Sequence, residues 1–225
     1  NSFFYLMKDE ELPEERLQCY RHVLVLTPSR LTTKNKECSF ILSQNPQIDF
    51  IKTINEFYIE FDPVMIAASA RIHSEASIGH NVSIGENSVI GPDVVVGNNT
   101  KILNNVVITG RVIIGKNCII KDNSTLGSGY EFVMDEKGEQ IHYPHIGTIR
   151  IGDHVWIGAN TSIESASLEN TVIGDSAKID DLVQIGYSSH IGDHCMITAG
   201  VIVNRYVKMG AHCLIAPNAS IRENV

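Results

Sequence analysis

The sequence is short of basic residues and has no cluster of them. Among its 225 residues, 18 are Lys or Arg and 26 are Asp or Glu, which gives a formal net charge of −8. Proteins that bind nucleic acid or an anionic membrane surface depend on clustered Lys and Arg. We therefore expect neither of these as a partner.

Long hydrophobic runs are also missing. No apolar stretch approaches the ~20 residues that a membrane-spanning helix needs, and the first residues lack the pattern of a signal peptide. We expect no membrane insertion. The chain opens at Asn1 and stops at Val225 within a repeating pattern, which favours a piece of a longer protein.

The cysteines are few, and their spacing is not that of a metal site. Cys19, Cys38, Cys118, Cys195 and Cys213 are odd in number and scattered along the chain. We predict small buried thiols in a reducing cytoplasm, with no metal and no tightly bound cofactor.

What the sequence does have is an aliphatic residue at every sixth position. Such a period fits neither an amphipathic helix nor a hairpin. It is typical of a parallel β-helix, in which each hexad forms one short strand and one corner, with Gly, Asn and Asp at the corners. The positions are Ile66, Ile72, Ile78, Ile84, Ile90, Val96, Ile102, Ile108, Ile114, Ile120, Leu126, Ile151, Ile157, Ile163, Ile173, Ile179, Ile185, Ile191, Ile197, Val203, Met209, Ile215 and Ile221.

These positions predict two domains and a mainly β protein. The 23 hexads make seven to eight coils if three hexads form one coil, and residues 63–225 form this β-helix domain. Residues 1–62 do not repeat. They predict a small α/β segment with strands in 21–30 and 38–44 and a helix from Pro46 that Asn45 caps. Ile48, Ile51, Ile54 and Phe57 would line one face of that helix, and a linker would follow at 60–64.

Function in a repeating coil usually resides where the period breaks. The larger break, 127–149, carries the aromatic and histidine residues Tyr130, Phe132, His142, Tyr143 and His145 around a polar hairpin tip. A smaller break covers residues 164–170. We expect the larger insertion to be functional, since long loops in compact domains usually are; the alternative is a loop that only covers a coil edge.

Two stretches carry a family resemblance: "HIGTIRIGDHVWIGANTSI" from His145 and "NTVIGDSAKIDDLVQIG" ending at Gly186. With the hexads, they resemble the left-handed β-helix acyltransferases, and among these the UDP-3-O-acylglucosamine N-acyltransferases of lipid A synthesis. The resemblance implies a left-handed coil and a homotrimer with sites between subunits. It also implies transfer of an acyl chain from acyl carrier protein or acyl-CoA to the amine of a nucleotide-linked sugar, without a metal.

The chain departs from that family at several site positions. Tyr187 stands where the family has its general-base histidine, and Asn224 stands where it has a second histidine. Arg205 replaces a glycine whose N–H helps to bind the oxyanion. In the N-terminal segment, Phe4 and its aromatic neighbours replace the family's uracil-binding motif.

We predict that the catalytic residues are among Tyr187, His190 and His194. A free tyrosine has a pKa near 10 and is a poor base, but its hydroxyl would donate to an oxyanion. His190 has the pKa range of a base. Histidine recurs at the fourth hexad place, at His154, His194 and His212, so the alternative for His194 is a corner residue that stacks between coils.

The remaining candidates bind substrates. For the acceptor sugar we predict Asp181, Tyr143, His145 and Phe4. A second group would line the donor groove, where the guanidinium and ammonium groups would meet phosphates; the alternative is ordinary surface charge. This group consists of Asn204, Arg205, Lys208 and Arg222.

The function predicted from these residues is that of an enzyme, a cytoplasmic sugar N-acyltransferase of lipid A or surface-polysaccharide synthesis. Its partners would be a nucleotide sugar, an acyl donor and two further copies of the chain. Two alternatives stay open. One is a sugar O-acetyltransferase that uses His190 or His194 as its base. The other is a catalytically silent trimeric scaffold, which the loss of histidine at Tyr187 favours.

Overall fold

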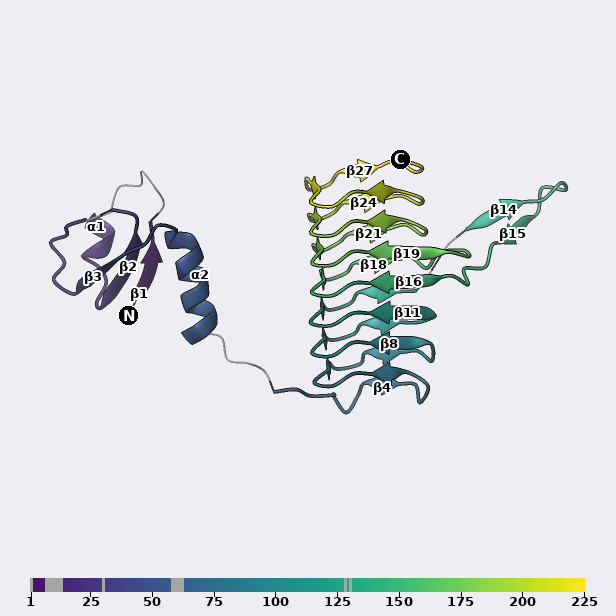
Figure 1. The fold of residues 1–225 in the computed structure, drawn as a ribbon, viewed down its shortest axis with the longest axis horizontal. Coiled ribbons are helices and arrows are strands. Elements are labelled where there is room, and N and C mark those ends of the chain that lie inside the picture. Colours follow the sequence, from purple (N-terminus) through teal and green to yellow (C-terminus); the bar gives the residue numbers. More distant parts are fainter. Residues whose placement is uncertain (1, 7–13, 30, 58–62, 128, 130) are drawn as a thin grey trace. The chain divides into compact units, whose positions relative to one another are not determined.

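The computed structural model describes residues 2–6, 14–29, 31–57, 63–127, 129 and 131–225. The chain divides into two compact units, Asn1–Pro63 and Val64–Val225 (Figure 1). Tyr130 and most of the linker predicted at 60–64 lie outside the described residues. None of the helices within the described ranges is long and apolar enough to cross a membrane.

The first unit is a small parallel sheet with two helices. Its strands lie in the order β1 (Ser2–Tyr5), β2 (Val23–Thr27) and β3 (Cys38–Leu42), and all pair in parallel. The helices are α1 (Glu14–Leu17) and α2 (Pro46–Phe57). The strands predicted in 21–30 and 38–44 and the helix predicted from Pro46 are therefore confirmed, while β1 was not predicted.

The apolar face of α2 differs from the prediction, while its cap position agrees with it. Ile48 and Ile51 are exposed; the helix packs through Phe50, whose ring lies 4.6 Å from that of Phe3 and 5.0 Å from that of Tyr5. Asn45 stands at the cap position, as predicted, and its carbonyl oxygen accepts the backbone N–H of Asp49 at 3.0 Å. The side chain that bonds in the first turn is that of Ser43, whose hydroxyl donates to the Asp49 carboxylate at 2.6 Å. The predicted apolar face was wrong because the sheet meets the helix one residue away from Ile51.

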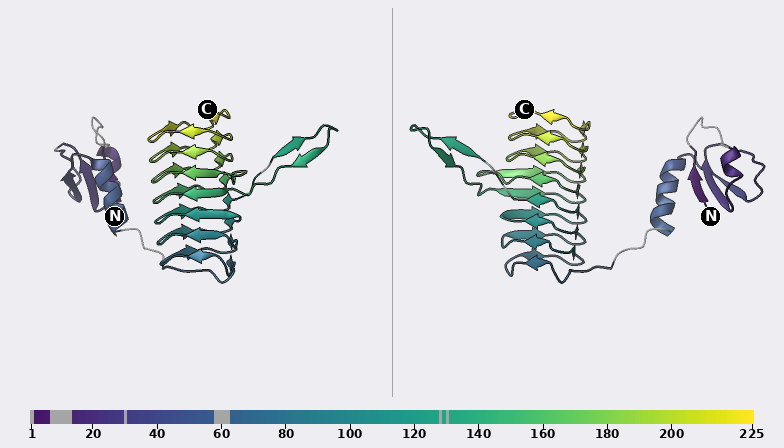
Figure 2. Two further views of the ribbon diagram at one scale, coloured as in Figure 1. Left: turned by 45° about the vertical axis from the view of Figure 1, so that its right-hand side comes forward. Right: turned by 180° about the vertical axis from the view of Figure 1, so that it is seen from behind.

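The second unit is a parallel β-helix with three flat faces (Figures 1 and 2). Sheet I contains β4 (Arg71–Ile72), β7 (Val89–Ile90), β10 (Val107–Ile108), β13 (Thr125–Leu126), β18 (Ser162–Ile163), β21 (Gln184–Ile185), β24 (Ile202–Val203) and β27 (Ser220–Ile221). Sheet II contains β5 (Ser77–Ile78), β8 (Val94–Val96), β11 (Arg111–Ile114), β16 (Thr148–Ile151), β19 (Asn170–Ile173), β22 (His190–Ile191) and β25 (Lys208–Met209). Sheet III contains β6 (Ser83–Ile84), β9 (Lys101–Ile102), β12 (Ile119–Ile120), β17 (Trp156–Ile157), β20 (Lys178–Ile179), β23 (Met196–Ile197) and β26 (Leu214–Ile215).

The sixth-position residues stack inside the coil in register. Ile163, for example, pairs with Ile185 of the next coil, and Ile185 pairs with Val203; all three are 0% exposed. Burying each such side chain contributes roughly 1.5–3 kcal/mol, and the ladder repeats through every coil. This repetition is why a sequence period alone predicts the fold.

The corners explain the polar places of the hexad. Residues at the fourth place adopt left-handed backbone conformations, for example Asn117 with φ 55° and His194 with φ 56°, and asparagine tolerates this conformation better than most residues. Glycine at the second place has another cause. A Cβ on Gly115 would lie 2.4 Å from the carbonyl oxygen of Gly152 in the next coil, so no larger residue fits there.

The inserted segments at both breaks of the period project from the same corner of the coil, the one between sheets I and II. The larger one forms an antiparallel hairpin of β14 (Phe132–Met134) and β15 (Gln140–His142), which extends away from the coil (Figure 2). The smaller one lies between β18 and β19 in the next coil. We call this edge of the coil the I–II corner.

Candidate functional site

Tyr187 lies at the I–II corner, in the turn between β21 and β22. It is only 3% exposed. Its ring meets that of His145 edge to face, with centroids 4.7 Å apart, and meets that of Tyr206 at 5.3 Å. The insertion therefore covers the position at which the sequence predicts the reaction centre.

The hydroxyl of Tyr187 is held by charged neighbours. Arg205, one coil further on, donates from Nη1 to this hydroxyl at 2.7 Å. Burial raises the pKa of Tyr187 well above its ordinary value, a hydrogen bond with Glu131 raises it further, and Arg205 opposes both effects. The phenol therefore stays protonated. In this form it can donate a hydrogen bond, but it cannot act as a general base.

Arg205 joins three parts of the chain. The same Nη1 donates to the carboxylate of Glu131 in the insertion at 2.9 Å, and Nε donates to Glu223 in the last coil at 2.7 Å. Glu131 is 74 residues away in sequence. We call Tyr187, Arg205, Glu131 and His145 the corner cluster.

His145 is the most enclosed histidine of the corner, with a side chain 4% exposed. Its Nδ1 lies 2.6 Å from the carbonyl oxygen of Ser165 in the smaller break. Because a carbonyl oxygen only accepts, Nδ1 carries the proton. Nε2 has no hydrogen-bond partner among the described residues and lies 4.0 Å from Oε2 of Glu131. The hydroxyls of Ser165 and Ser167 are buried there without a described partner too.

A second carboxylate lies beneath the cluster. Glu164 accepts the backbone N–H of Tyr187 at 3.3 Å and the side-chain amide of Gln184 at 3.2 Å. Burial raises the pKa of Glu164, while the two hydrogen bonds and nearby His145 lower it. The corner therefore combines a neutral phenol, a guanidinium and two carboxyl groups around one imidazole.

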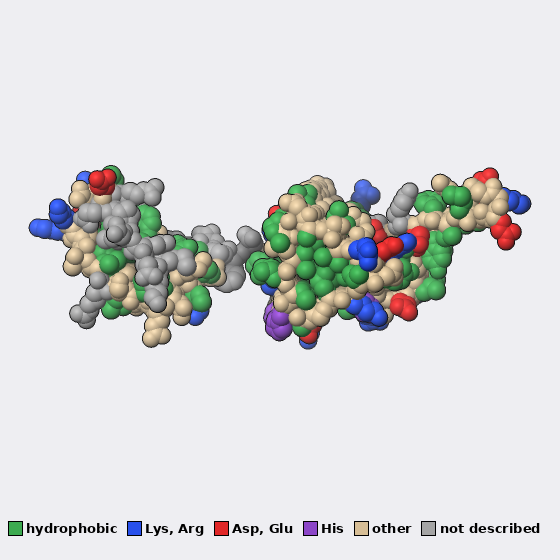
Figure 3. Space-filling view, turned by 90° about the horizontal axis from the view of Figure 1, so that it is seen from above, with side chains coloured by type: hydrophobic (Ala, Val, Ile, Leu, Met, Phe, Trp, Pro, Cys, Tyr) green, Lys and Arg blue, Asp and Glu red, His purple; other side chains and the backbone are tan. Residues whose placement is uncertain are grey.

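The other two predicted catalytic residues lie elsewhere on the coil. His190 is exposed on the outer face of β22, in register with Lys208 of β25. His194 occupies the next corner, between sheets II and III, and stacks on His212 at 4.9 Å with the rings 5° apart. Seen from above, histidine side chains gather at one corner (Figure 3). The structure therefore does not bring Tyr187, His190 and His194 together.

The predicted substrate-binding residues are also divided. Tyr143 lies edge to face with His145, 6.5 Å between centroids. Asp181 is at the corner between sheets III and I, where its Oδ1 accepts the backbone N–H of Ala159 at 2.7 Å and Nζ of Lys121 at 3.2 Å. These hydrogen bonds, the first above all, lower the pKa of Asp181.

Phe4 belongs to the first unit, where its ring packs edge-on against Tyr20 at 5.4 Å. Among the residues predicted to bind the acyl donor, Asn204 and Arg205 lie at the I–II corner of one coil, and Arg222 lies at the same corner of the next coil. Asn204 donates from Nδ2 to the carbonyl of Ile221 at 2.8 Å, and Arg222 is exposed. The donor candidates thus gather around the end of this corner and on the adjoining strand β25.

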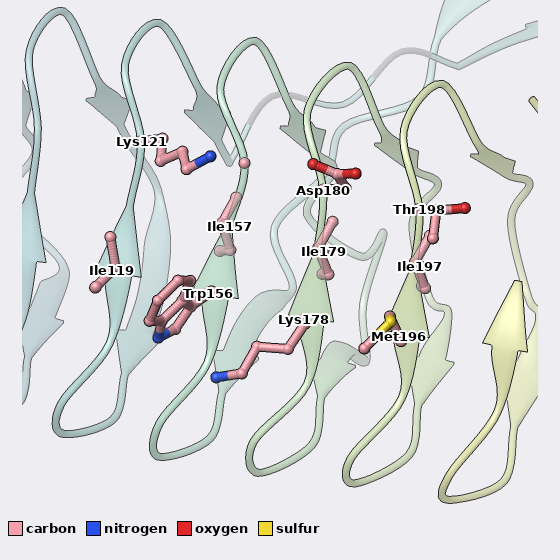
Figure 4. Close-up of a pocket in the computed structure, with 11 residues that line it drawn as sticks. Ile119, Lys121, Trp156, Ile157, Lys178, Ile179, Asp180, Met196, Ile197 and Thr198 are labelled. Atoms are coloured by element: carbon pink, nitrogen blue, oxygen red, sulfur yellow. The ribbon is translucent and has the colours of Figure 1, made fainter. Parts of the chain in front are cut away.

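A shallow groove crosses the outer face of sheet III (Figure 4). Lys178 lies over the ring of Trp156, 4.9 Å from its centroid, and donates to the carbonyl of His154 at 2.6 Å. Burial lowers the pKa of Lys178. Trp156 lies on the outer face of the coil and is 48% exposed. The groove has no reactive cluster comparable to that of the I–II corner.

Sequence reasoning missed Glu131 and Glu164. Glu131 and Glu164 lie in or beside the two breaks, and an acidic residue in an insertion gives no signal of its own. Within the described ranges, no group of three His, Cys, Asp or Glu side chains is placed to hold a metal ion.

Three family models match parts of the chain. The model described as GMPPB C-terminal domain matches residues 61–135. The hexapeptide repeat of succinyl-transferase matches residues 148–180, and the bacterial transferase hexapeptide (six repeats) matches residues 170–205. The last two cover Tyr187 and Arg205 and the coil below them.

Curated relatives are acyltransferases. UDP-3-O-acylglucosamine N-acyltransferase of Coxiella burnetii is 46% identical over 85 residues, which are 36% of this chain and 25% of that protein. The enzyme of the same name from Janthinobacterium sp. is 37% identical over 113 residues, 47% of this chain and 32% of that protein. The chain therefore spans about a quarter to a third of the length of these relatives.

A solved structure agrees with these relatives. The UDP-N-acetylglucosamine acyltransferase of Francisella novicida superposes with a TM-score of 0.63 at 26% identity, covering 71% of this chain and 56% of that one. The fold predicted from the sequence, a left-handed parallel β-helix with a small α/β segment, is confirmed. Residues 148–205 of the second unit match models of transferase hexapeptide repeats, and the relatives named above are UDP-sugar acyltransferases.

Proposed function

We propose that this chain transfers an acyl group from a thioester donor to the amine of a nucleotide-linked amino sugar. The observation that carries the proposal is the I–II corner. Both breaks of the period leave the coil there, and together with Tyr187 and Arg205 they build one enclosed polar cluster. Polar groups that converge where a repeat is interrupted are the usual mark of a binding site in a solenoid.

The chemistry of acyl transfer fits this cluster. The attacking amine has to lose a proton, and the carbonyl oxygen has to be stabilised when it becomes negative. Tyr187 remains protonated and holds Arg205 at 2.7 Å, and the guanidinium supplies the positive charge that stabilises the oxyanion. Neither group needs a metal ion for these roles.

The donor approaches along the upper end of the same corner in this proposal. Arg205 and Lys208 place two positive charges on one coil, and Arg222 places a third on the next coil; the phosphates of CoA or of a carrier-protein prosthetic group would be bound there. Asn204 lies among them. For the acceptor, Tyr143 and His145 contact the sugar from the insertion, while Asp181 and Phe4 remain candidates for contacts outside the corner.

We also propose that the active form is a homotrimer with sites between subunits, as the family resemblance implies. The hairpin β14–β15 supports this proposal. Its residues Phe132, Val133 and Ile141 are about half exposed, and an isolated two-stranded hairpin is only marginally stable in water. The five free thiols fit a reducing compartment, so we place the activity in the cytoplasm, in lipid A or surface-polysaccharide synthesis.

Two observations favour other functions. His190 is exposed on sheet II and lies in register with Lys208. An accessible histidine at this place favours an O-acyltransferase that uses it as the general base. The 3% exposure of Tyr187 favours a silent scaffold whose former site is filled.

The test is thiol release from acyl-CoA and acyl carrier protein donors, offered with UDP- and dTDP-linked amino sugars. Release that depends on an amino sugar, and a product that resists hydroxylamine as an amide does, support the proposal. A hydroxylamine-sensitive ester that needs His190 indicates the O-acyltransferase instead. No release with any donor and acceptor indicates the scaffold.

A further inference from the structure

Two hydrogen-bond acceptors in the corner cluster face each other with no donor between them. Nε2 of His145 and Oε2 of Glu131 lie 4.0 Å apart. The bond from Nδ1 to the carbonyl of Ser165 places a proton on Nδ1, so a ring that carries one proton has its lone pair on Nε2. A distance of 4.0 Å is too long for a hydrogen bond between the two groups, so the imidazole and the carboxylate do not satisfy each other.

The separation of these atoms suits a bridging amine. A nitrogen placed about 2.8 Å from both would see them at an angle of about 90°, below the roughly 107° between two N–H bonds, and two slightly bent hydrogen bonds make up the difference. An amine can therefore donate to both atoms at once, whereas a hydroxyl has one hydrogen and can satisfy only one of them. A buried lone pair beside a carboxylate is costly when unpaired, and a bound amine removes that cost.

The neighbours of His145 determine how an amine reaches it. The ring edge of Tyr187 lies on one side and Tyr143 on another, and Glu164 lies close enough to interact with the imidazole charge. Glu131 is 21% exposed at its side chain and is held by Arg205. Glu131 is more exposed than His145, whose side chain is 4% exposed, so in this inference an amine reaches the pair from the side of the carboxylate.

We infer that Glu131 and His145 bind the amine of the acceptor sugar, and that Nε2 of His145 takes up the proton which this nitrogen loses. The inference rests on the proposed function. The amine nitrogen attacks the thioester carbonyl carbon, a C–N bond forms and the nitrogen gives its proton to Nε2. The C–S bond then breaks, and the proton passes from the imidazolium to the leaving thiolate, which leaves an amide, a thiol and neutral His145.

A base supplied by the insertion explains how the corner can work with Tyr187 in place of a histidine. Tyr187 cannot take a proton at neutral pH, but its ring holds the imidazole from the side. His145 in turn is oriented by the carbonyl of Ser165, in the way that a second group usually fixes a catalytic histidine.

The decisive variant is His145→Asn. The asparagine amide can replace Nδ1 as the donor to Ser165, but it has nothing in the place of Nε2. His142→Asn is the matched control, because His142 belongs to the same insertion and is exposed. Both are compared with the unmodified chain in thiol release with an amino-sugar acceptor, from about pH 6 to about pH 9.

We expect His145→Asn to lower kcat by about 10²–10⁴-fold, with the KM for the thioester changed less than about twofold. The acidic limb of the pH profile, which reports a base in the bound complex, disappears with it. His142→Asn keeps the full rate and profile. Adding Tyr187→His to His145→Asn restores part of kcat, because it returns an imidazole to the corner.

A second measurement does not depend on turnover. Nitrogen NMR of the labelled histidines should show that the neutral ring of His145 carries its proton on Nδ1, with chemical shifts of Nε2 that move when an amino sugar is added. A neutral ring with its proton on Nε2 overturns the inference. So does an active chain in which His145→Asn keeps its rate and pH profile. If the unmodified chain transfers no acyl group to any amine, the proposed function fails, and the inference falls with it.

Discussion

Arg205 donates to the hydroxyl of Tyr187 from the next coil, at 2.7 Å, and the two residues are 18 positions apart. That number is one full coil of three hexads. The same guanidinium nitrogen also binds Glu131 in the insertion at 2.9 Å. One side chain therefore fastens the base of the hairpin to the coil and closes the corner over Tyr187.

The first prediction concerns this fastening. Arg205→Met removes the donor to Tyr187 and Glu131, and each lost bond to a charged group costs about 1.5–3 kcal/mol. The hairpin should open more often, so trypsin should cleave after Lys137 at its tip about tenfold faster, the factor that corresponds to about 1.4 kcal/mol. Arg222→Met is the control, since Arg222 is exposed in the following coil. Equal cleavage rates in the two variants would contradict the fastening role.

The second prediction is that Tyr187 loses its proton only at a pH above the ordinary range of tyrosine. Its folded-state pKa is raised by burial, and by Glu131, so its contribution to stability is complete below the ordinary tyrosine pKa of about 10. That contribution is lost as the pH rises through the folded-state pKa. Above about pH 10, the free energy of unfolding should fall more steeply for the unmodified chain than for Tyr187→Phe. Parallel pH curves for the two chains would show that the phenol is not held as described.

Leu182 offers a gain in stability. It has φ 61°, in the left-handed region, and is 65% exposed. This conformation costs a leucine about 1 kcal/mol and costs asparagine less, while little apolar burial is lost. Leu182→Asn should therefore raise the free energy of unfolding by about 0.5–1 kcal/mol, measured by urea denaturation. Leu214→Asn, at an exposed leucine in β26, should give no gain; a gain at both positions would mean that backbone strain is not the cause.

The ladder inside the coil can be tested at one step. Ile185 is fully buried, whereas Ile202 on the next strand of sheet I is 43% exposed. Ile185→Ala should cost about 2–5 kcal/mol, because each coil packs only against its neighbours and a cavity results. Ile202→Ala should cost less than about 1 kcal/mol. Similar losses at the two sites, in the same denaturation series, would be inconsistent with an inward ladder.

The fold was predictable because its signal is local and repeated. An isoleucine such as Ile185 is followed by the next inward residue after six positions, and the pattern survives both breaks. Corner histidines follow from the same period, and the stack of His194 on His212 agrees with the corner alternative for His194. The helix face was not predictable, since which side of α2 meets the sheet depends on the sheet's own aromatic residues.

The corner cluster was predictable only in part. Tyr187 and Arg205 were singled out as departures from a family pattern, and one coil length places them side by side. Glu131 could not be found in this way, because the hairpin returns it to the coil across 74 residues. His190 is three residues from Tyr187, but a coil turns its corner within that distance, so closeness in sequence does not place it at the site.

The most direct measurement of the central claim is product analysis by mass spectrometry with a matched pair of acceptors. The chain is given an acyl thioester and a UDP-amino sugar, and separately the same nucleotide sugar with a hydroxyl in place of the amine. The account predicts an amide-linked acyl sugar from the first and no acylated product from the second. An ester formed from the hydroxyl sugar, or no acylated product from either acceptor, would contradict it.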